Sequence, residues 1–196
     1  MYLVNPFCWC YTVGDMPTPL TPISPELRRV LELVNTLDFD PPADRLGTLS
    51  EARAWLAQSG LPGAIASESE RERLVALRQA VRPLLEANAG HGDPVQAWAG
   101  LEPFAASTPL YVRPGVDPSL SPAGSGLPAT IATVLATVYD AARAGTWKRL
   151  KLCRESTCAW AFYDESKNGS GTWCSMRVCG NRNKARRRRE RSRPTS

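Results

Sequence analysis

Apolar residues recur at helical spacing along most of the first 147 residues. The first such stretch predicts a helix from Pro25 to about Leu37, because Ser24 can cap it and proline suits the first helical position. The apolar face of this helix consists of Leu27, Val30, Leu31, Val34 and Leu37. Ahead of it, residues 1–23 are rich in proline, and we expect an extended leader there.

Capping signals and apolar spacing indicate further helices. Thr48 and Glu51 form a capping box for a short helix, and Ser69 and Glu72 form a second box for the longest helix. Pro83 lies inside the longest helix and should kink it or split it near residue 82. Amphipathic spacing then predicts two more helices, over 94–106 and 128–144.

Two stretches lack helical spacing. Residues 38–47 are polar and contain consecutive prolines, which predicts a loop. Leu110 to Arg113 alternates like a strand, and the turn-rich stretch after it indicates a small β-hairpin. The pattern therefore predicts an α+β protein with a mainly helical domain over 24–147 and a separate module over 148–196.

The distribution of charge agrees with this division. Residues 148–196 hold 14 Lys and Arg against 4 Asp and Glu, a net charge of +10, whereas residues 1–147 carry −5 of the overall +5. Positive charge concentrated in one segment is typical of nucleic-acid binding. An anionic membrane surface is a poorer partner, because an interfacial helix needs an apolar face that the basic segment lacks.

Four cysteines of this module form two pairs, with the spacing Cys153-x4-Cys158-x15-Cys174-x4-Cys179. Thiolates favour tetrahedral Zn²⁺, and four of them fill every coordination position, so such a site stabilises a fold and leaves no place for substrate. Two disulfides are the alternative, but they need an oxidising compartment. An aromatic run and a polar turn lie between the pairs, and this small unit should unfold when zinc is removed.

A dense basic run follows the last cysteine. Arginine, lysine and alanine are good helix formers, so the run predicts a helix that is polar on every face. Its like charges repel one another, and a polyanion would relieve that repulsion. A solvated tail without a partner is the alternative. The candidate nucleic-acid contacts are Arg182, Lys184, Arg186, Arg187, Arg188, Arg189 and Arg191.

The segment Trp173-Cys174-Ser175-Met176-x-x-Cys179-Gly180-Asn181-Arg182-x-Lys184, with Phe162-x-Asp164-x-Ser166 upstream, resembles the signature of the CGNR zinc-finger family. The resemblance implies a treble-clef-like finger in which the four cysteines bind zinc and the basic helix contacts nucleic acid. Leu31-x-Leu33-x-Asn35-Thr36 resembles the opening motif of the ABATE domain, which usually precedes this finger in stress-induced transcription regulators. The chain departs from the pattern at 169–172, where many relatives carry arginines.

Other chemistry has little support in the sequence. Phosphate-loop, nucleophile-elbow and HExxH motifs do not occur, so we expect no enzymatic activity. The single histidine, His91, lies in turn-like sequence where we expect solvent exposure. No stretch approaches the roughly 18 to 20 apolar residues that span a bilayer, and the first residues lack the basic start of a signal peptide, so we expect a cytoplasmic protein. Cys8 and Cys10 form a Cys-x-Cys whose role stays open.

These observations predict a two-domain DNA-binding transcription regulator. Zinc would orient the basic helix toward the phosphates of double-stranded DNA, while residues 24–147 would sense an unidentified small-molecule signal or mediate homo-oligomerisation. Two alternatives stay open: RNA binding through the finger aromatics, and binding of the arginines to an acidic protein surface, including that of the N-terminal domain. If the two domains are independent, deleting 148–196 should leave the stability of the remainder unchanged.

Overall fold

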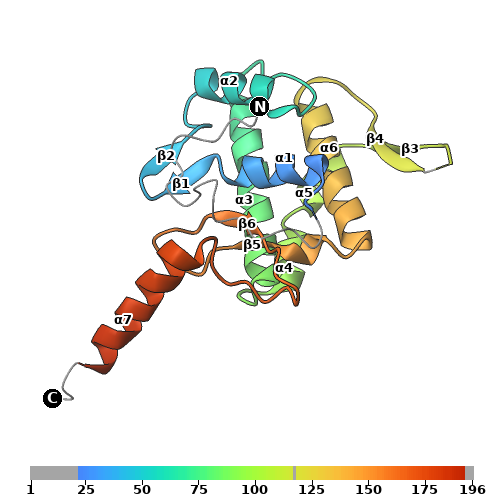
Figure 1. Ribbon diagram of the computed structural model, residues 1–196. Coiled ribbons are helices and arrows are strands. Elements are labelled where there is room, and N and C mark those ends of the chain that lie inside the picture. Colours follow the sequence, from blue (N-terminus) through green and yellow to red (C-terminus); the bar gives the residue numbers. More distant parts are fainter. Residues whose placement is uncertain (1–21, 117, 193–196) are drawn as a thin grey trace.

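The computed structural model describes residues 22–116 and 118–192, in which a helical body carries a small finger and a projecting basic helix (Figure 1). The long helices α1 (Pro25–Val34), α3 (Glu68–Asn88) and α6 (Gly126–Arg143) pack against one another in the body. The shorter helices are α2 (Leu49–Ser59), α4 (Pro94–Ala99) and α5 (Glu102–Ser107). The finger ends in α7 (Asn181–Arg191), which points away from the body in Figure 1.

Local capping explains where the first two helices begin. The Ser24 hydroxyl accepts a hydrogen bond from the Leu27 N–H at 3.2 Å, as the sequence predicts for α1. In α2, Thr48 and Glu51 form both halves of the capping box, and Gly60 ends the helix in a left-handed conformation with φ of 71°. These side chains satisfy backbone N–H groups that have no partner inside the helix.

The longest helix differs from its prediction in two respects. It begins one residue after Ser67, whose hydroxyl accepts from the Glu70 N–H at 3.3 Å, so the cap lies two residues before the predicted Ser69. The helix also continues through Pro83, so the predicted split does not occur, whereas a kink at the proline stays a prediction. Buried side chains on both sides of the proline, Val81 and Leu84, anchor the two halves in one core and outweigh the lost backbone hydrogen bond.

Two predictions of local structure were wrong. The polar stretch 38–47 is not a plain loop, because it contains a hairpin of β1 (Leu37–Phe39) and β2 (Pro42–Asp44), joined through a cis peptide bond at Pro41. Residues 94–106 do not form one helix but α4 and α5. Gly100 ends α4, and Pro103 lies in the first turn of α5, where a missing N–H costs little.

The predicted hairpin is present. Strands β3 (Leu110–Arg113) and β4 (Ser119–Pro122) pair antiparallel, with Leu110 opposite Pro122, and the pair extends away from the helical body (Figure 1). The α+β architecture predicted from the sequence is therefore confirmed. In the described parts of the chain, no helix is long and apolar enough to cross a membrane.

The body and the finger share one hydrophobic core. After the short helix η1 (Trp147–Arg149), strands β5 (Leu150–Leu152) and β6 (Ala161–Tyr163) form an antiparallel pair, and β5 packs on α3. The side chains of Trp147, Leu150, Leu152, Ala161 and Tyr163 belong to the same buried cluster as the apolar faces of α1, α3 and α6. From this shared core we expect the stability of the helical domain to depend on the finger, contrary to the expectation of two independent domains.

Candidate metal centre and basic helix

Four cysteine sulfurs converge at the outer end of the β5–β6 pair. Cys153, Cys158, Cys174 and Cys179 are all buried, and their Sγ atoms lie within 4.8 Å of one another. Two of the separations, Cys158 to Cys174 and Cys174 to Cys179, are 3.6 Å. A disulfide would need about 2.05 Å, whereas a tetrahedron with Zn–S bonds of about 2.3 Å places its sulfurs about 3.8 Å apart. The donor set therefore fits a closed zinc site.

Backbone hydrogen bonds shape the two cysteine loops. In the first loop the N–H groups of Cys158 and Ala159 donate to the Glu155 carbonyl at 2.9 and 3.1 Å, which folds the four intervening residues into a tight turn. In the second loop the Ser175 hydroxyl accepts from the Val178 N–H, and the Ser175 carbonyl accepts from Cys179 at 2.9 Å. Each pair is thus presented by a local turn.

The electrostatics of the cluster favour metal binding. Hydrogen bonding to the thiols of Cys158, Cys174 and Cys179 lowers the pKa of Cys153 far below its usual range, despite the opposing effect of burial. A thiolate is the form that binds zinc. A second small core of Phe162, with Trp160 and Trp173 packed against it, covers the sulfurs from solvent.

The loop between the cysteine pairs is fixed by a buried ion pair. Lys151 Nζ donates to Asp164 Oδ2 at 2.7 Å and also to the Gly169 and Gly171 carbonyls. Burial opposes ionisation of Asp164, but hydrogen bonds from Lys151, Ser166 and the Gly171 N–H outweigh it and lower its pKa. A Cβ on Gly171 would lie 2.6 Å from Asp164 Oδ1, so this position has no room for a side chain. The turn is thereby held against β5.

Three successive residues, Cys179, Gly180 and Asn181, fix the start of α7. Cys179 closes the sulfur cluster at the end of the turn η2 (Met176–Gly180). Gly180 packs so closely that a Cβ would lie 2.5 Å from Met176 Sδ. The Asn181 amide donates to the Arg177 carbonyl at 2.8 Å, which ties the first turn of α7 to η2. The direction of α7 therefore follows from the metal centre.

The predicted nucleic-acid residues all lie on α7, where every residue except the half-buried Asn183 is exposed. Two of them form ion pairs within the chain. Arg182 lies 2.5 Å from Asp40 of the β1–β2 hairpin, and both side chains are about half exposed. Arg186 lies 2.6 Å from Glu155, whose side chain is only 2% exposed. In the described part of the chain, the other predicted contacts form no ion pair: Lys184, Arg187, Arg188, Arg189 and Arg191.

One face of α7 borders a groove of about 620 Å³ that the sequence did not predict. Arg182, Arg186 and Arg189 line it together with Arg177, which precedes the helix. Arg177 was missed because it lies inside the second cysteine loop, before the basic run. The helical repeat would not have found it, because extending that repeat backwards from α7 places Val178, and not Arg177, on the face of Arg182 and Arg186.

Asn35 and Thr36, at the end of α1, are structural. The Asn35 amide donates to the Ala161 carbonyl and accepts from the Ala161 N–H, both at 2.8 Å, so it joins α1 to β6. Thr36 accepts from Arg78, which is itself paired with Asp44 of β2 at 2.5 and 2.8 Å. His91, expected in solvent, is half-buried and lies 3.4 Å from the Arg154 side chain. Cys8 and Cys10 lie outside the described residues.

The fold and the cysteine cluster together define a zinc-finger protein whose finger is fused to a helical domain. Family models match both parts in the same order: residues 149–192 match the CGNR zinc finger, and residues 27–145 match ABATE, described as "Putative stress-induced transcription regulator". The chain therefore belongs to the ABATE family and carries a CGNR zinc finger, as the sequence motifs predict. No curated protein matches the chain. One of these descriptions is of a zinc finger and the other is of a regulator, and neither describes an enzyme.

Proposed function

We propose that this protein regulates transcription in the cytoplasm, without catalysis, by binding double-stranded DNA through α7. Cys153, Cys158, Cys174 and Cys179 would hold one Zn²⁺, which supplies a rigid link between the two cysteine loops. The helical domain would respond to a signal or mediate self-association. The groove beside α7, lined by four arginines, is the observation that carries the DNA-binding part of the proposal.

Charge and geometry make this groove suitable for phosphates. Guanidinium groups bind phosphate oxygens through paired hydrogen bonds, and four of them line one continuous surface. The remaining basic residues of α7 surround the helix, so a phosphate backbone on either side meets positive charge. Most contacts of this kind position a protein on DNA and do not read its sequence.

The intramolecular ion pairs refine the roles of two predicted contacts. Asp40 and Arg182 are both exposed, so a phosphate can replace the carboxylate at little cost. Glu155 is buried, and removing its partner would leave a charge without compensation in the protein interior. Arg186 therefore anchors α7 on the finger through Glu155. Arg189 and Lys184, which form no such pair with any described residue, are better candidates than Arg186 for contacts with phosphate.

Burial of the finger aromatics favours duplex DNA over single-stranded RNA. Phe162 and Tyr163 are buried at 5% and 8% exposure, and Trp160 and Trp173 pack partly against the sulfur cluster. Stacking on unpaired bases needs exposed ring faces. Comparing duplex DNA with single-stranded RNA at equal salt tests this preference.

A salt titration with matched variants tests the DNA-binding proposal. If α7 neutralises about six phosphates, log affinity should fall with log salt at a slope of roughly −5, and Arg189→Gln should reduce that slope by about 1. Arg143→Gln, the same change on α6, is the control and should leave the slope unchanged. Binding that does not depend on salt, or that responds equally to both variants, would exclude this interface.

The acidic-partner alternative has one observation in its favour, the Arg182–Asp40 pair between α7 and the helical body. If this pair limits access of DNA to α7, Asp40→Asn should tighten DNA binding. If α7 instead serves an acidic protein, Asp40→Asn should leave DNA affinity unchanged and weak. The two outcomes separate a DNA-binding helix from a protein-binding one.

A further inference from the structure

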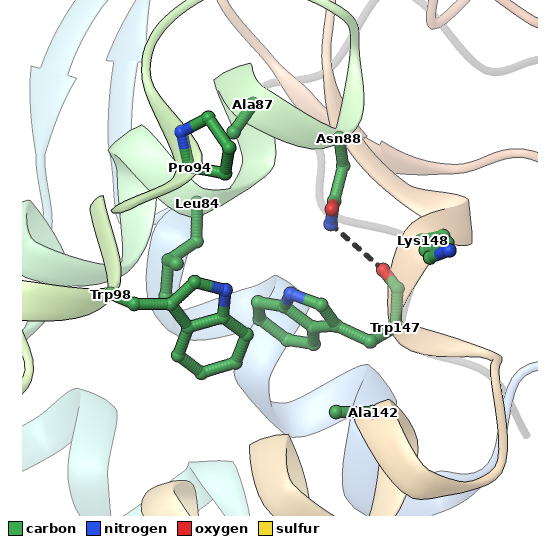
Figure 2. Close-up of a pocket in the computed structure, with 8 residues that line it drawn as sticks. All are labelled: Leu84, Ala87, Asn88, Pro94, Trp98, Ala142, Trp147 and Lys148. Carbon is green, nitrogen blue, oxygen red and sulfur yellow. Dashed lines mark hydrogen bonds between the residues drawn. The ribbon is translucent and has the colours of Figure 1, made fainter. Parts of the chain in front are cut away.

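A cavity of about 370 Å³ lies where the helical body meets the start of the finger (Figure 2). Its walls are mainly apolar and come from α3, α4, α6 and η1: Leu84, Ala87, Pro94, Trp98, Ala142 and Trp147. Trp98 and Trp147 face each other with ring centroids 6.3 Å apart and planes inclined by 47°. Cavities of this size and composition accommodate small organic ligands.

One polar group in this cavity has no protein partner among the described residues. The indole N–H of Trp147 is buried without a hydrogen bond, although only 3% of the residue is exposed. In Figure 2 this nitrogen lies on the edge of the ring that faces Trp98 and the interior of the cavity. The nitrogen of the neighbouring Asn88 amide donates to the Trp147 and Leu150 carbonyls at 2.9 Å, and the Asn88 oxygen accepts no hydrogen bond from the indole N–H.

Two further features point to a ligand at this place. Trp98 keeps 43% of its surface exposed, although it borders an apolar cavity, and Val95 on the same helix is also an exposed apolar side chain. Lys148 lies at the rim of the same cavity and adds a positive charge. A buried N–H without an acceptor costs about 1–3 kcal/mol, so an occupant that offers an oxygen there would be favoured.

We propose that this junction cavity binds a small aromatic carboxylate. The flat ring lies in the space bordered by Leu84, Pro94 and Trp98, beside the pair of tryptophans and not between them. The carboxylate accepts from the Trp147 N–H and pairs with Lys148. The inference deepens the sensing part of the proposed function. Its test uses no nucleic acid, so the cavity and the DNA interface can fail separately.

Direct binding of 2-naphthoate to the full-length, zinc-loaded protein tests the proposal. Calorimetry should give one saturable site with a Kd on the order of 0.1 to 1 mM, in keeping with a ligand of this size. The cationic analogue 2-naphthylmethylammonium offers no acceptor and repels Lys148, so we expect it to bind at least about tenfold more weakly.

Matched variants locate the site. Trp98→Ala removes an exposed wall of the cavity and should weaken 2-naphthoate binding about tenfold or more. Tyr111→Ala, an equally exposed aromatic on β3 at 47%, should not change it. Trp147→Phe keeps an aromatic wall but removes the N–H, and Lys148→Gln removes the charge; each should weaken binding about three- to tenfold.

Three results would overturn the proposal: no saturable binding of 2-naphthoate, equal binding of the cationic analogue, or equal effects of Trp98→Ala and Tyr111→Ala. Trp98 and Lys148 are at the surface, so their variants should fold normally, and unchanged thermal transitions would verify this. A result therefore remains interpretable even if Trp147→Phe lowers stability.

Discussion

Replacing Asn35 by alanine should destabilise the whole protein, because this side chain completes the finger. Asn35 occupies the place of a neighbouring strand: it accepts from the Ala161 N–H and donates to the Ala161 carbonyl, both at 2.8 Å. Ala161 itself is 1% exposed. Truncation at Asn35 would leave one donor and one acceptor of β6 without partners in a buried position.

The expected loss follows from those two groups. Each unsatisfied buried polar group costs about 1–3 kcal/mol, and water can reach the half-buried Asn35 position in part. We therefore expect Asn35→Ala to lower the free energy of unfolding by about 2–4 kcal/mol. Because body and finger share a core, urea unfolding followed by tryptophan fluorescence should show one transition with a lower midpoint and an unchanged slope.

Two further variants separate hydrogen bonding from side-chain volume. Asn35→Asp keeps the shape but places a carboxylate oxygen against the Ala161 carbonyl, so it should destabilise at least as much as alanine at neutral pH. Asn183→Ala makes the same truncation at another half-buried position, on the projecting helix α7, and should change stability by less than about 0.5 kcal/mol. If Asn35→Ala and Asn183→Ala have equal effects, the Asn35 side chain does not hold the finger.

Three other perturbations have defined outcomes. Chelation of zinc should open the amides of 153–160 and 172–180 to hydrogen exchange while β5 stays protected, because its side chains belong to the shared core; equal exchange throughout would contradict this. Deleting 148–196 should lower the melting temperature of the remaining domain by about 10 °C or more, through lost core packing; an unchanged melting temperature would restore the independent-domain prediction. Burial opposes ionisation of Asp44, but hydrogen bonds from Arg78 and from the backbone lower its pKa, so its contribution to stability is present above the unfolded pKa of about 3.8 and is lost as pH falls through the lower folded pKa. Asp44→Asn should therefore remove part of the acid sensitivity, and identical pH profiles would refute the assignment.

Features encoded by neighbouring residues were predictable from the sequence. The zinc ligands occur as two local pairs, so their spacing alone indicates the site, and the turn from Cys179 into α7 follows directly. The capping box of α2 depends on residues three positions apart, and it formed as predicted. The groups of the capping box lie within one turn of the chain, and each cysteine pair lies within one short loop.

Features that depend on distant residues were not predictable. The pair Arg182–Asp40 joins positions 142 residues apart, and no local pattern marks either residue. Trp147 was taken as the boundary between two units, yet it is buried in a core that both share, because apolar spacing shows that a residue is buried but not against what. Trp98 shows the converse: it lies in the stretch 94–106, for which one amphipathic helix was predicted, but the break between α4 and α5 leaves it at the mouth of a cavity.

Helix α3 contacts the junction cavity, the loop beside the cysteine cluster and the β1–β2 hairpin. We therefore expect binding at one of these sites to affect binding at the others. At its C-terminal end Asn88 holds η1 beside the cavity, and one and a half turns earlier Arg82 donates to the Ala159 carbonyl next to the cysteine cluster at 2.9 Å. One turn further, Arg78 fixes the β1–β2 hairpin whose Asp40 contacts α7. A ligand that favours this arrangement of η1 on α3 also favours the arrangement of the finger, and the free energy of coupling is the same in both directions. Zinc loading should therefore tighten 2-naphthoate binding, and an equal Kd for 2-naphthoate in the zinc-loaded and zinc-free protein would show that the two sites are not coupled.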